Sequence, residues 1–217
     1  MQEVESDEAV TRSLVCELLP LFYDKGWVAG TGGGICTRLG EHTALMAPTG
    51  VHKERVLPND LFVVDVASGG VIRPPKNISL RLSECGPIFC EILNRRGAGS
   101  VMHTHALSAV LAADLAHGQE EVILEGLEML KGIRGLTNVD LHAVPIVHNT
   151  ARESELVAQI IEACEKKAYE KSYCILVRDH GAYIWGKDLW ETKRHAEVYH
   201  FLFEAIVARA QMKAFWV

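Results

Sequence analysis

Two histidines separated by a single residue, His103 and His105, form the pattern in this chain with the clearest chemistry. They end the segment Ser100-Val-Met-His-Thr-His, whose apolar start is typical of a β-strand. Residues i and i+2 of a strand lie on the same face, so both imidazoles can reach one metal ion such as zinc. The alternative is a pair of polar residues at a strand end, and the pair alone does not favour either interpretation.

His180 is a candidate for a third ligand. It lies in Val177-Arg-Asp-His-Gly-Ala-Tyr-Ile-Trp-Gly186, where a turn containing Gly181 joins two apolar segments. A side chain at such a turn projects from the end of a sheet. Three histidines leave an open fourth position on zinc, as catalytic zinc sites do. An ordinary turn residue is the alternative. The other histidines are expected to be solvated or packed: His42, His52, His117, His142, His148, His195 and His200.

Three turns have features of anion-binding sites. Gly30-Thr-Gly-Gly-Gly34 and Pro48-Thr-Gly50 expose backbone N–H groups, and Ser83 begins a predicted helix, where a hydroxyl and the helix dipole favour negative charge. The first turn is not a dinucleotide fingerprint, because the G-x-G-x-x-G spacing is missing, and it is not a Walker loop, because no Gly-Lys-Ser/Thr follows. An ordinary turn or helix cap is the alternative for each.

Two carboxylates and a thiol complete the set of reactive side chains. Cys85 follows Ser83 and Glu84 at the predicted helix start, where an exposed thiol would have a lowered pKa and a buried one would be a small core residue. Glu84 is most simply a carboxylate of the first helical turn. Glu128, in a helical turn over residues 125–133, is by its periodicity a solvated residue.

Hydrophobic periodicity predicts an α/β chain that positions these residues. Short turns between several strands favour antiparallel pairing, with helices covering the faces of the sheet. We therefore expect a three-layer α/β/α fold with a central, mainly antiparallel sheet, and one domain over residues 1–217. Helices are expected over 7–26, 84–96, 106–116, 152–168 and 188–213, and strands over 34–38, 43–47, 61–66, 100–104, 144–148, 174–178 and 182–185.

The composition excludes several classes of protein. The net charge of −6 argues against nucleic-acid binding, which needs a basic surface. The longest apolar run, Tyr199–Ala210, is interrupted by Glu204 and Arg209 and is too short to span a membrane. The acidic start, Met1–Glu8, does not resemble a signal peptide. The six cysteines form no C-x-x-C pair, which indicates reduced thiols. We expect a cytoplasmic protein.

In this order and spacing, the motifs resemble the class II aldolase/adducin-like family, from about residue 7 to about residue 210. The resemblance implies one zinc ion per subunit, held by His103, His105 and His180. It also implies a sugar-phosphate substrate and a cyclic homotetramer with sites near the subunit interfaces. The implied phosphate subsite consists of Thr31, Gly33, Gly34, Thr49, Gly50 and Ser83.

Within the family, the chain most resembles sugar-phosphate dehydratases of methionine salvage. The resemblance is carried by Gly-Thr-Gly-Gly-Gly-Ile, Ala-Pro-Thr-Gly-Val, Ser-x-Cys at 83–85, Met-His-Thr-His at 102–105 and Glu-Met-Leu-Lys-Gly-Ile at 128–133. It implies conversion of 5-methylthioribulose 1-phosphate to 2,3-diketo-5-methylthiopentyl 1-phosphate through a metal-stabilised enediolate. Glu128 would be the acid/base and Cys85 a substrate contact.

Glu84 lies where related aldolases carry their catalytic carboxylate, so a sugar-phosphate aldolase or pentulose-phosphate 4-epimerase with Glu84 as the acid/base is the alternative. A non-catalytic adducin-like interaction module is a further alternative. It is disfavoured because it has no need of the three histidines.

Overall fold

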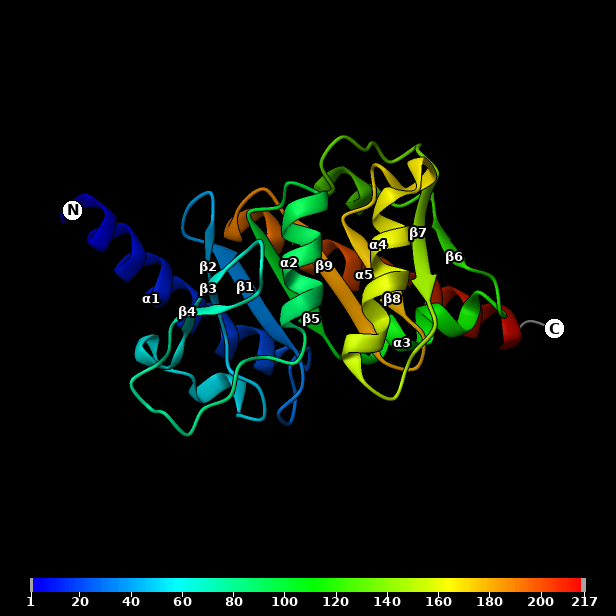
Figure 1. The fold of residues 1–217 in the computed structure, drawn as a ribbon. Coiled ribbons are helices and arrows are strands. Elements are labelled where there is room, and N and C mark those ends of the chain that lie inside the picture. Colours follow the sequence, from blue (N-terminus) through cyan, green and yellow to red (C-terminus); the bar gives the residue numbers. More distant parts are fainter. Residues whose placement is uncertain (1, 216–217) are drawn as a thin grey trace.

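One nine-stranded sheet organises the computed structural model, which describes residues 2–215, with side chains from 7 to 214 (Figure 1). The strands are β1 (Gly34–Arg38), β2 (Thr43–Met46), β3 (Phe62–Asp65), β4 (Val71–Arg73), β5 (Ser100–Thr104), β6 (Glu121–Leu124), β7 (His142–Val147), β8 (Cys174–Val177) and β9 (Gly181–Gly186). Their order is β4-β3-β2-β1-β5-β9-β8-β7-β6. Only the β7–β8 pair is parallel among these described strands, so the expected mainly antiparallel α/β fold is confirmed.

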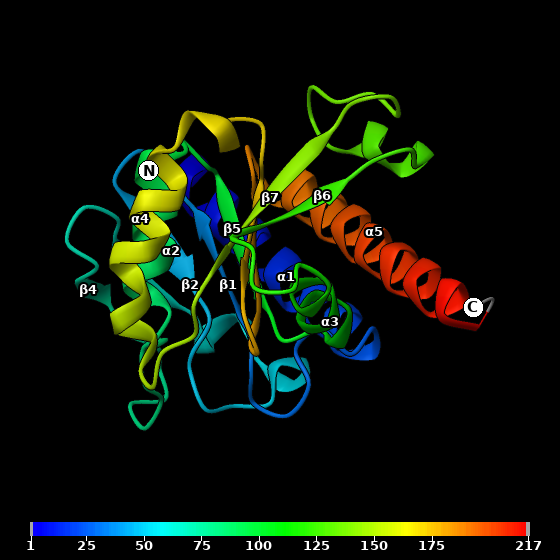
Figure 2. The same ribbon diagram turned by 90° about the vertical axis from the view of Figure 1, so that its right-hand side faces the viewer.

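Helices cover both faces of the sheet. The α-helices are α1 (Gln2–Asp24), α2 (Gly86–Arg95), α3 (Leu107–Leu115), α4 (Val157–Glu165) and α5 (Leu189–Phe215). Figure 2 shows α2 and α4 on one face and α1, α3 and α5 on the other, which makes the three layers. Short 3₁₀ helices lie in the connections: η1 (Lys53–Arg55), η2 (Pro58–Asp60), η3 (Glu128–Gly132), η4 (Glu153–Leu156) and η5 (Lys167–Tyr169). No helix in the described range is long and apolar enough to cross a membrane.

Strand alternation divides the core into two apolar clusters, one on each face. In β5, Met102 packs into the cluster below α1, α3 and α5, and Val101 packs into the cluster below α2 and α4. His103 lies two residues after Val101, so it faces the α2 and α4 side, where its ring stacks on Tyr183 with centroids 4.2 Å apart.

The sequence did not predict two strands, β4 and β6, which form the two edges of the sheet. β4 is three residues long and all of it is exposed, and only two of the four residues of β6 are buried. Edge strands have few buried positions, so they lack the alternating pattern that reveals a strand. The helix expected over 152–168 is divided into η4, α4 and η5.

Strand directions decide which loops meet. His103 on β5 pairs with Gly34 at the start of β1, and Thr104 pairs with Ala182 at the start of β9. The ends of β7 and β8 lie at the same edge, since Val147 pairs with Val177. We call this boundary of the sheet, which is formed by strand ends and not by the lateral strands β4 and β6, the histidine edge. It contains the starts of β1 and β9 and the ends of β2, β5, β7 and β8.

Candidate metal centre

Three imidazoles converge at the histidine edge. His103 lies on β5, His105 directly follows it, and His180 lies in the turn between β8 and β9. The Nε2–Nε2 distances are 2.9 Å for His103 and His105, 3.1 Å for His105 and His180, and 3.2 Å for His103 and His180. A tetrahedral zinc with bonds of 2.0–2.1 Å requires nitrogens about 3.3–3.4 Å apart. The triangle therefore has nearly the dimensions that such an ion needs.

The outer nitrogens of two of these rings show how the inner ones are protonated. His103 Nδ1 lies 3.1 Å from the carbonyl oxygen of Ala182, and His180 Nδ1 lies 3.1 Å from Oδ1 of Asn149. Both partners are acceptors, so Nδ1 donates in each case and Nε2 presents a lone pair. The lone pairs of His103 and His180, on nitrogens 3.2 Å apart, repel one another unless a cation lies between them, so this pair fits a divalent metal ion.

The protonation states also suit a metal. Burial, as the largest cause, lowers the pKa of all three histidines, to about 4 for His105 and well below the usual range for His103. All three are therefore neutral at pH 7. Neutral imidazole is the form that binds metal, so no proton has to be displaced near neutral pH.

Glu153, the first residue of η4, faces the histidines and was missed by sequence reasoning. Its Oε1 lies 3.7 Å from His103 Nε2 and 3.8 Å from His180 Nε2, and Tyr183 donates a hydrogen bond of 3.3 Å to Oε2. These four side chains could hold one metal ion, because their ligand atoms lie within 4.8 Å of one another. The only available sequence signal was that Glu153 follows a strand predicted to end near residue 148.

Cys85 borders the same site as a neutral thiol. It is buried, its backbone N–H donates to Ser83 Oγ at 3.3 Å, and its thiol contacts Glu153 and Tyr183. Burial raises the pKa of the Cys85 thiol well above its usual range. The lowered pKa expected for an exposed thiol at a helix start therefore does not apply here.

The three turns that the sequence predicts to bind an anion also lie at the histidine edge. Gly33 has a φ of +70°, and a Cβ there would lie 2.8 Å from the carbonyl oxygen of His103. A Cβ at Gly34 would lie 3.9 Å from Ser83 Oγ, so the first and third turns are neighbours. Thr49 donates its N–H to Arg81 O at 3.0 Å, which joins the second turn to the segment leading into Ser83. Gly50 and the exposed Thr31 complete the predicted phosphate set.

The two predicted acid/base carboxylates are not part of the histidine cluster. Glu84 is exposed at the start of α2. Glu128 is 70% exposed and its described partner is Lys131 at 2.6 Å. It follows β6, whose last residue, Leu124, pairs with the first residue of β7. Glu128 therefore lies at the edge opposite the histidines, roughly 15–20 Å away along strands of this length.

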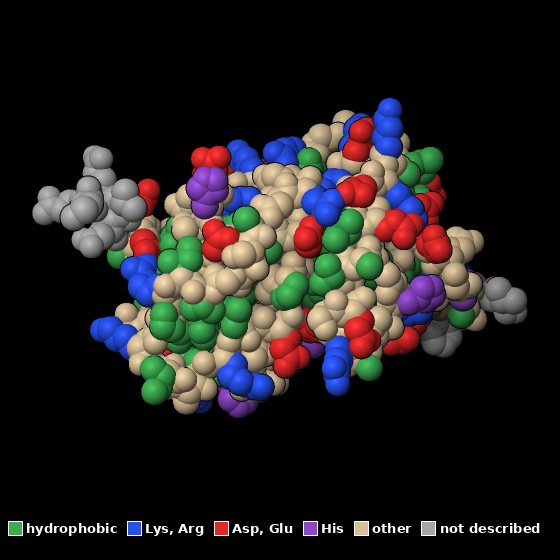
Figure 3. All heavy atoms as spheres, viewed as in Figure 1, with side chains coloured by type: hydrophobic (Ala, Val, Ile, Leu, Met, Phe, Trp, Pro, Cys, Tyr) green, Lys and Arg blue, Asp and Glu red, His purple; other side chains and the backbone are tan. Residues whose placement is uncertain are grey.

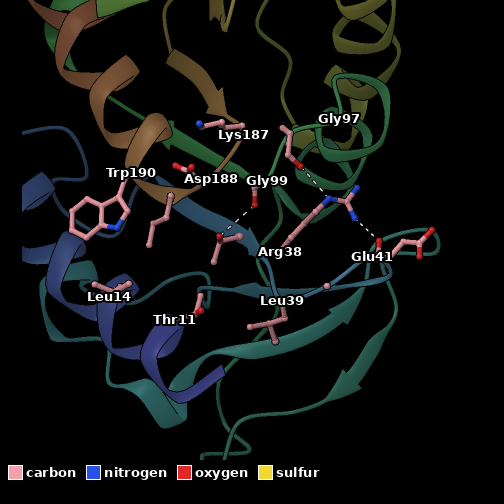
Figure 4. A pocket seen from close by; sticks show the side chains of 14 residues that line it. Thr11, Leu14, Arg38, Leu39, Glu41, Gly97, Gly99, Lys187, Asp188 and Trp190 are labelled. Carbon is pink, nitrogen blue, oxygen red and sulfur yellow. Dashed lines mark hydrogen bonds between the residues drawn. The ribbon is translucent and has the colours of Figure 1, made fainter. Parts of the chain in front are cut away.

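A large cavity of about 680 Å³ also lies at this opposite edge. Figure 4 shows its walls, which include Arg38 at the end of β1, Gly99 before β5 and Lys187 after β9. The Arg38 guanidinium donates to the carbonyl oxygens of Ala98 and Leu93, so its donors are used within the fold. The cavity contains no histidine, and we assign the chemistry to the histidine edge.

Comparisons with known proteins identify relatives of the chain. The family model for the class II aldolase and adducin N-terminal domain matches residues 13–207. The methylthioribulose-1-phosphate dehydratase of Xenopus tropicalis is 42% identical over 212 residues, covering 94% of this chain and 87% of that protein. The corresponding dehydratase of Mus musculus is 40% identical, covering 95% and 86%.

Solved structures resemble the fold at low identity. L-fuculose-1-phosphate aldolase from Thermus thermophilus superposes with a TM-score of 0.66 at 19% identity, covering 96% of this chain and 97% of that chain. YgbL from Escherichia coli superposes with a TM-score of 0.76 at 18% identity, covering 92% and 89%.

Proposed function

Because the chain belongs to the class II aldolase and adducin family, we propose that it converts 5-methylthioribulose 1-phosphate to 2,3-diketo-5-methylthiopentyl 1-phosphate in methionine salvage. The reaction is that of a hydro-lyase. One observation carries the proposal: three Nε2 atoms converge within 3.2 Å beside a carboxylate, in a chain about 40% identical to dehydratases over nearly its whole length.

His103, His105 and His180 would hold one zinc ion per subunit, with Glu153 beside them. Bound there, zinc supplies a Lewis acid next to the ketone of the substrate. The hydrogen bonds that Nδ1 of His103 and Nδ1 of His180 donate keep those two rings oriented with Nε2 toward the metal position.

The phosphate would bind at the three turns of the histidine edge, through hydroxyls and backbone N–H groups. Binding the phosphate there fixes carbons C2 to C4 beside the histidines and uses remote binding energy for orientation. Cys85 would contact the substrate as a neutral thiol, because its raised pKa excludes a thiolate at pH 7. The phosphate set is Thr31, Gly33, Gly34, Thr49, Gly50 and Ser83.

Dehydration requires a group that takes the C3 proton and a proton donor to the C4 hydroxyl, which leaves as water. The enol that remains tautomerises to the diketone. Glu128 is the proposed acid/base. Since Glu128 lies at the opposite edge of its own subunit, we propose that Glu128 of the partner subunit completes each site in a homotetramer.

The surface around Glu128 is suited to such a contact. Met129 is 37% exposed, Val139 83% and Leu141 71%, so apolar side chains in the same connection face outward. Clustered exposed apolar groups are typical of protein interfaces. We further propose that residues 1–217 act as a single domain and that the enzyme is cytoplasmic.

The test is incubation of the purified protein with 5-methylthioribulose 1-phosphate, together with analysis of bound metal. We expect the diketone, release of one water and about one zinc per subunit, and we expect His103→Ala and His180→Ala to lose both metal and activity. Glu128→Gln should keep metal and lose turnover. Carbon–carbon cleavage or epimerisation of the pentulose, with activity lost in Glu84→Gln and kept in Glu128→Gln, would instead identify an aldolase or epimerase with Glu84 as the acid/base.

A further inference from the structure

A lysine that no motif includes is buried behind the phosphate turns. Lys53, on η1, is 1% exposed. Its Nζ donates to the carbonyl oxygens of Thr31 at 2.9 Å and Val51 at 3.1 Å. It therefore ties the glycine-rich turn to the chain that follows Pro48-Thr49-Gly50. A buried ammonium is costly unless an opposite charge or strong hydrogen bonds compensate it.

Lys53 forms no ion pair with a carboxylate among the residues with described side chains. Burial lowers the pKa of its ammonium, and the charge of the neighbouring Glu54 offsets this only in part. Oε1 of Glu54 itself lies 3.8 Å from His52 Nδ1 and 3.8 Å from Arg55 Nε. An ammonium has three donors, and two of them are used by carbonyl oxygens. Among the described side chains, the charge thus lacks a direct ion pair and one donor lacks an acceptor.

The ammonium also lies close to the metal centre. Its acceptor Thr31 directly precedes Gly32, where a Cβ would lie 2.4 Å from Nδ1 of His105. The charge of Lys53 is therefore next to the space between the phosphate turns and the histidines. The whole chain has a net charge of −6, so attraction of an anion to this site must come from local groups of this kind.

We propose that Lys53 is a positioning and specificity residue, whose buried charge makes the subsite selective for a phosphate monoester dianion. The inference rests on the proposed function, because it assigns the phosphate of that substrate to these turns. An incoming dianion would provide the close countercharge that Glu54 supplies only in part. The hydrogen bonds that Lys53 donates to Thr31 and Val51 also fix the positions of both turns.

Binding of inorganic phosphate to the metal-loaded protein tests the charge without turnover. Lys53→Met removes charge and donors, and Lys53→Gln removes the charge and keeps an amide donor for the carbonyl oxygens. We expect calorimetry to show phosphate binding weakened roughly tenfold to hundredfold in both. Arg55→Met is the matched control, because it removes one positive charge from the same turn at a side chain that is 81% exposed. It should bind phosphate as the wild type does.

Substrate selectivity separates charge from structural support. Wild type should prefer 5-methylthioribulose 1-phosphate over the unphosphorylated ketose in kcat/KM. Lys53→Gln should lose most of that preference, because its kcat/KM for the phosphorylated ketose should fall much further than its kcat/KM for the unphosphorylated ketose, and its zinc content should stay near wild type. Equal losses for both ketoses, or phosphate affinity equal to that of Arg55→Met, would overturn the proposal. If wild type turns over neither ketose, the proposed function fails, and phosphate affinity alone still decides the role of Lys53.

Discussion

At the scale of single residues, Glu153 adds a negative charge to a centre of neutral ligands. Its Oε1 is 3.7–3.8 Å from two Nε2 atoms, too far for a hydrogen bond to either ring but close enough to stabilise a cation placed among them. Tyr183 donates to the other carboxylate oxygen and so fixes its orientation. The centre is thus a set of three neutral nitrogens with one anchored carboxylate.

Glu153→Gln should therefore weaken zinc binding about tenfold to hundredfold, the usual effect of removing an outer partner of a metal site. Titration against a competing chelator measures this affinity. Glu155→Gln is the matched control, because Glu155 is an exposed carboxylate on the same 3₁₀ turn. Equal zinc affinity in the two variants would show that the carboxylate at Glu153 does not act on the metal.

The residue scale also shows what the sequence could reveal. The spacing of His103 and His105 places both on one face of a strand, so their proximity follows from strand geometry alone. Glu153 belongs to a segment expected to continue as a plain helix. Its approach to the histidines depends on β7 lying parallel to β8, a pairing that no local pattern encodes.

At the scale of elements, the glycine-rich turn also makes room for the imidazole of His105. A Cβ at Gly32 would lie 2.4 Å from Nδ1 of His105. No side chain, even a methyl group, fits there unless the imidazole moves. The lack of a side chain at Gly32 is therefore required by the space that His105 occupies, in addition to the proposed approach of an anion.

Gly32→Ala should consequently displace His105 and lower zinc affinity at least tenfold, with little change in the free energy of unfolding of the metal-free protein. Zinc titration and urea unfolding measure the two quantities. Gly40→Ala provides the comparison, since the nearest atom to its added Cβ is Thr43 Oγ1 at 3.8 Å. If both variants bind zinc as wild type does, the contact with His105 is relieved without cost.

Two buried histidines outside the metal centre make the free energy of unfolding depend on pH. Burial, as the largest cause, lowers the pKa of His200 on α5 to about 3 and that of His142 on β7 to about 4. An unfolded histidine titrates near pH 6.5. Between that value and the folded value, only the unfolded chain binds the proton, so stability is complete above about pH 6.5 and falls as the pH decreases.

Each of these two histidines should lower the free energy of unfolding by about 2 kcal/mol at pH 5 relative to pH 7. Urea unfolding at the two pH values should show a smaller decrease in His200→Phe than in wild type. His42→Gln, at a side chain that is 76% exposed, should leave the decrease unchanged. A decrease of the same size in His200→Phe would mean that His200 does not contribute to acid sensitivity.

The elements explain why the histidines of the site could be located from the sequence and the position of Glu128 could not. Central strands such as β5 and β9 are buried and bordered by turns, so their positions and the histidines at their ends were predictable. β6 is a short edge strand that no pattern marked. Without β6, nothing placed Glu128 at the edge opposite the histidines.

At the scale of the whole molecule, the described surface has apolar regions at sites away from the histidine edge. β4 exposes Val71 and Ile72, and Figure 3 shows apolar side chains gathered over that end of the molecule. Trp190, beside the cavity of Figure 4, is 56% exposed. Patches of this kind suit contacts between copies of the chain. The proposed homotetramer would both cover apolar surface and bring Glu128 to the histidines of another subunit.

Mixing two inactive variants tests that arrangement. His103→Ala subunits keep Glu128 and lack a complete metal site, whereas Glu128→Gln subunits keep the metal site and lack the carboxylate. If Glu128 of the partner subunit serves each site, a mixed tetramer contains some sites in which all three histidines and Glu128 are intact. Denaturing and refolding the two variants together, with zinc, should therefore restore a substantial fraction of dehydratase activity.

A double variant, His103→Ala with Glu128→Gln, mixed with wild type in the same way is the control for refolding. Mixed tetramers that form by native mass spectrometry and stay inactive would show that Glu128 does not act across the interface.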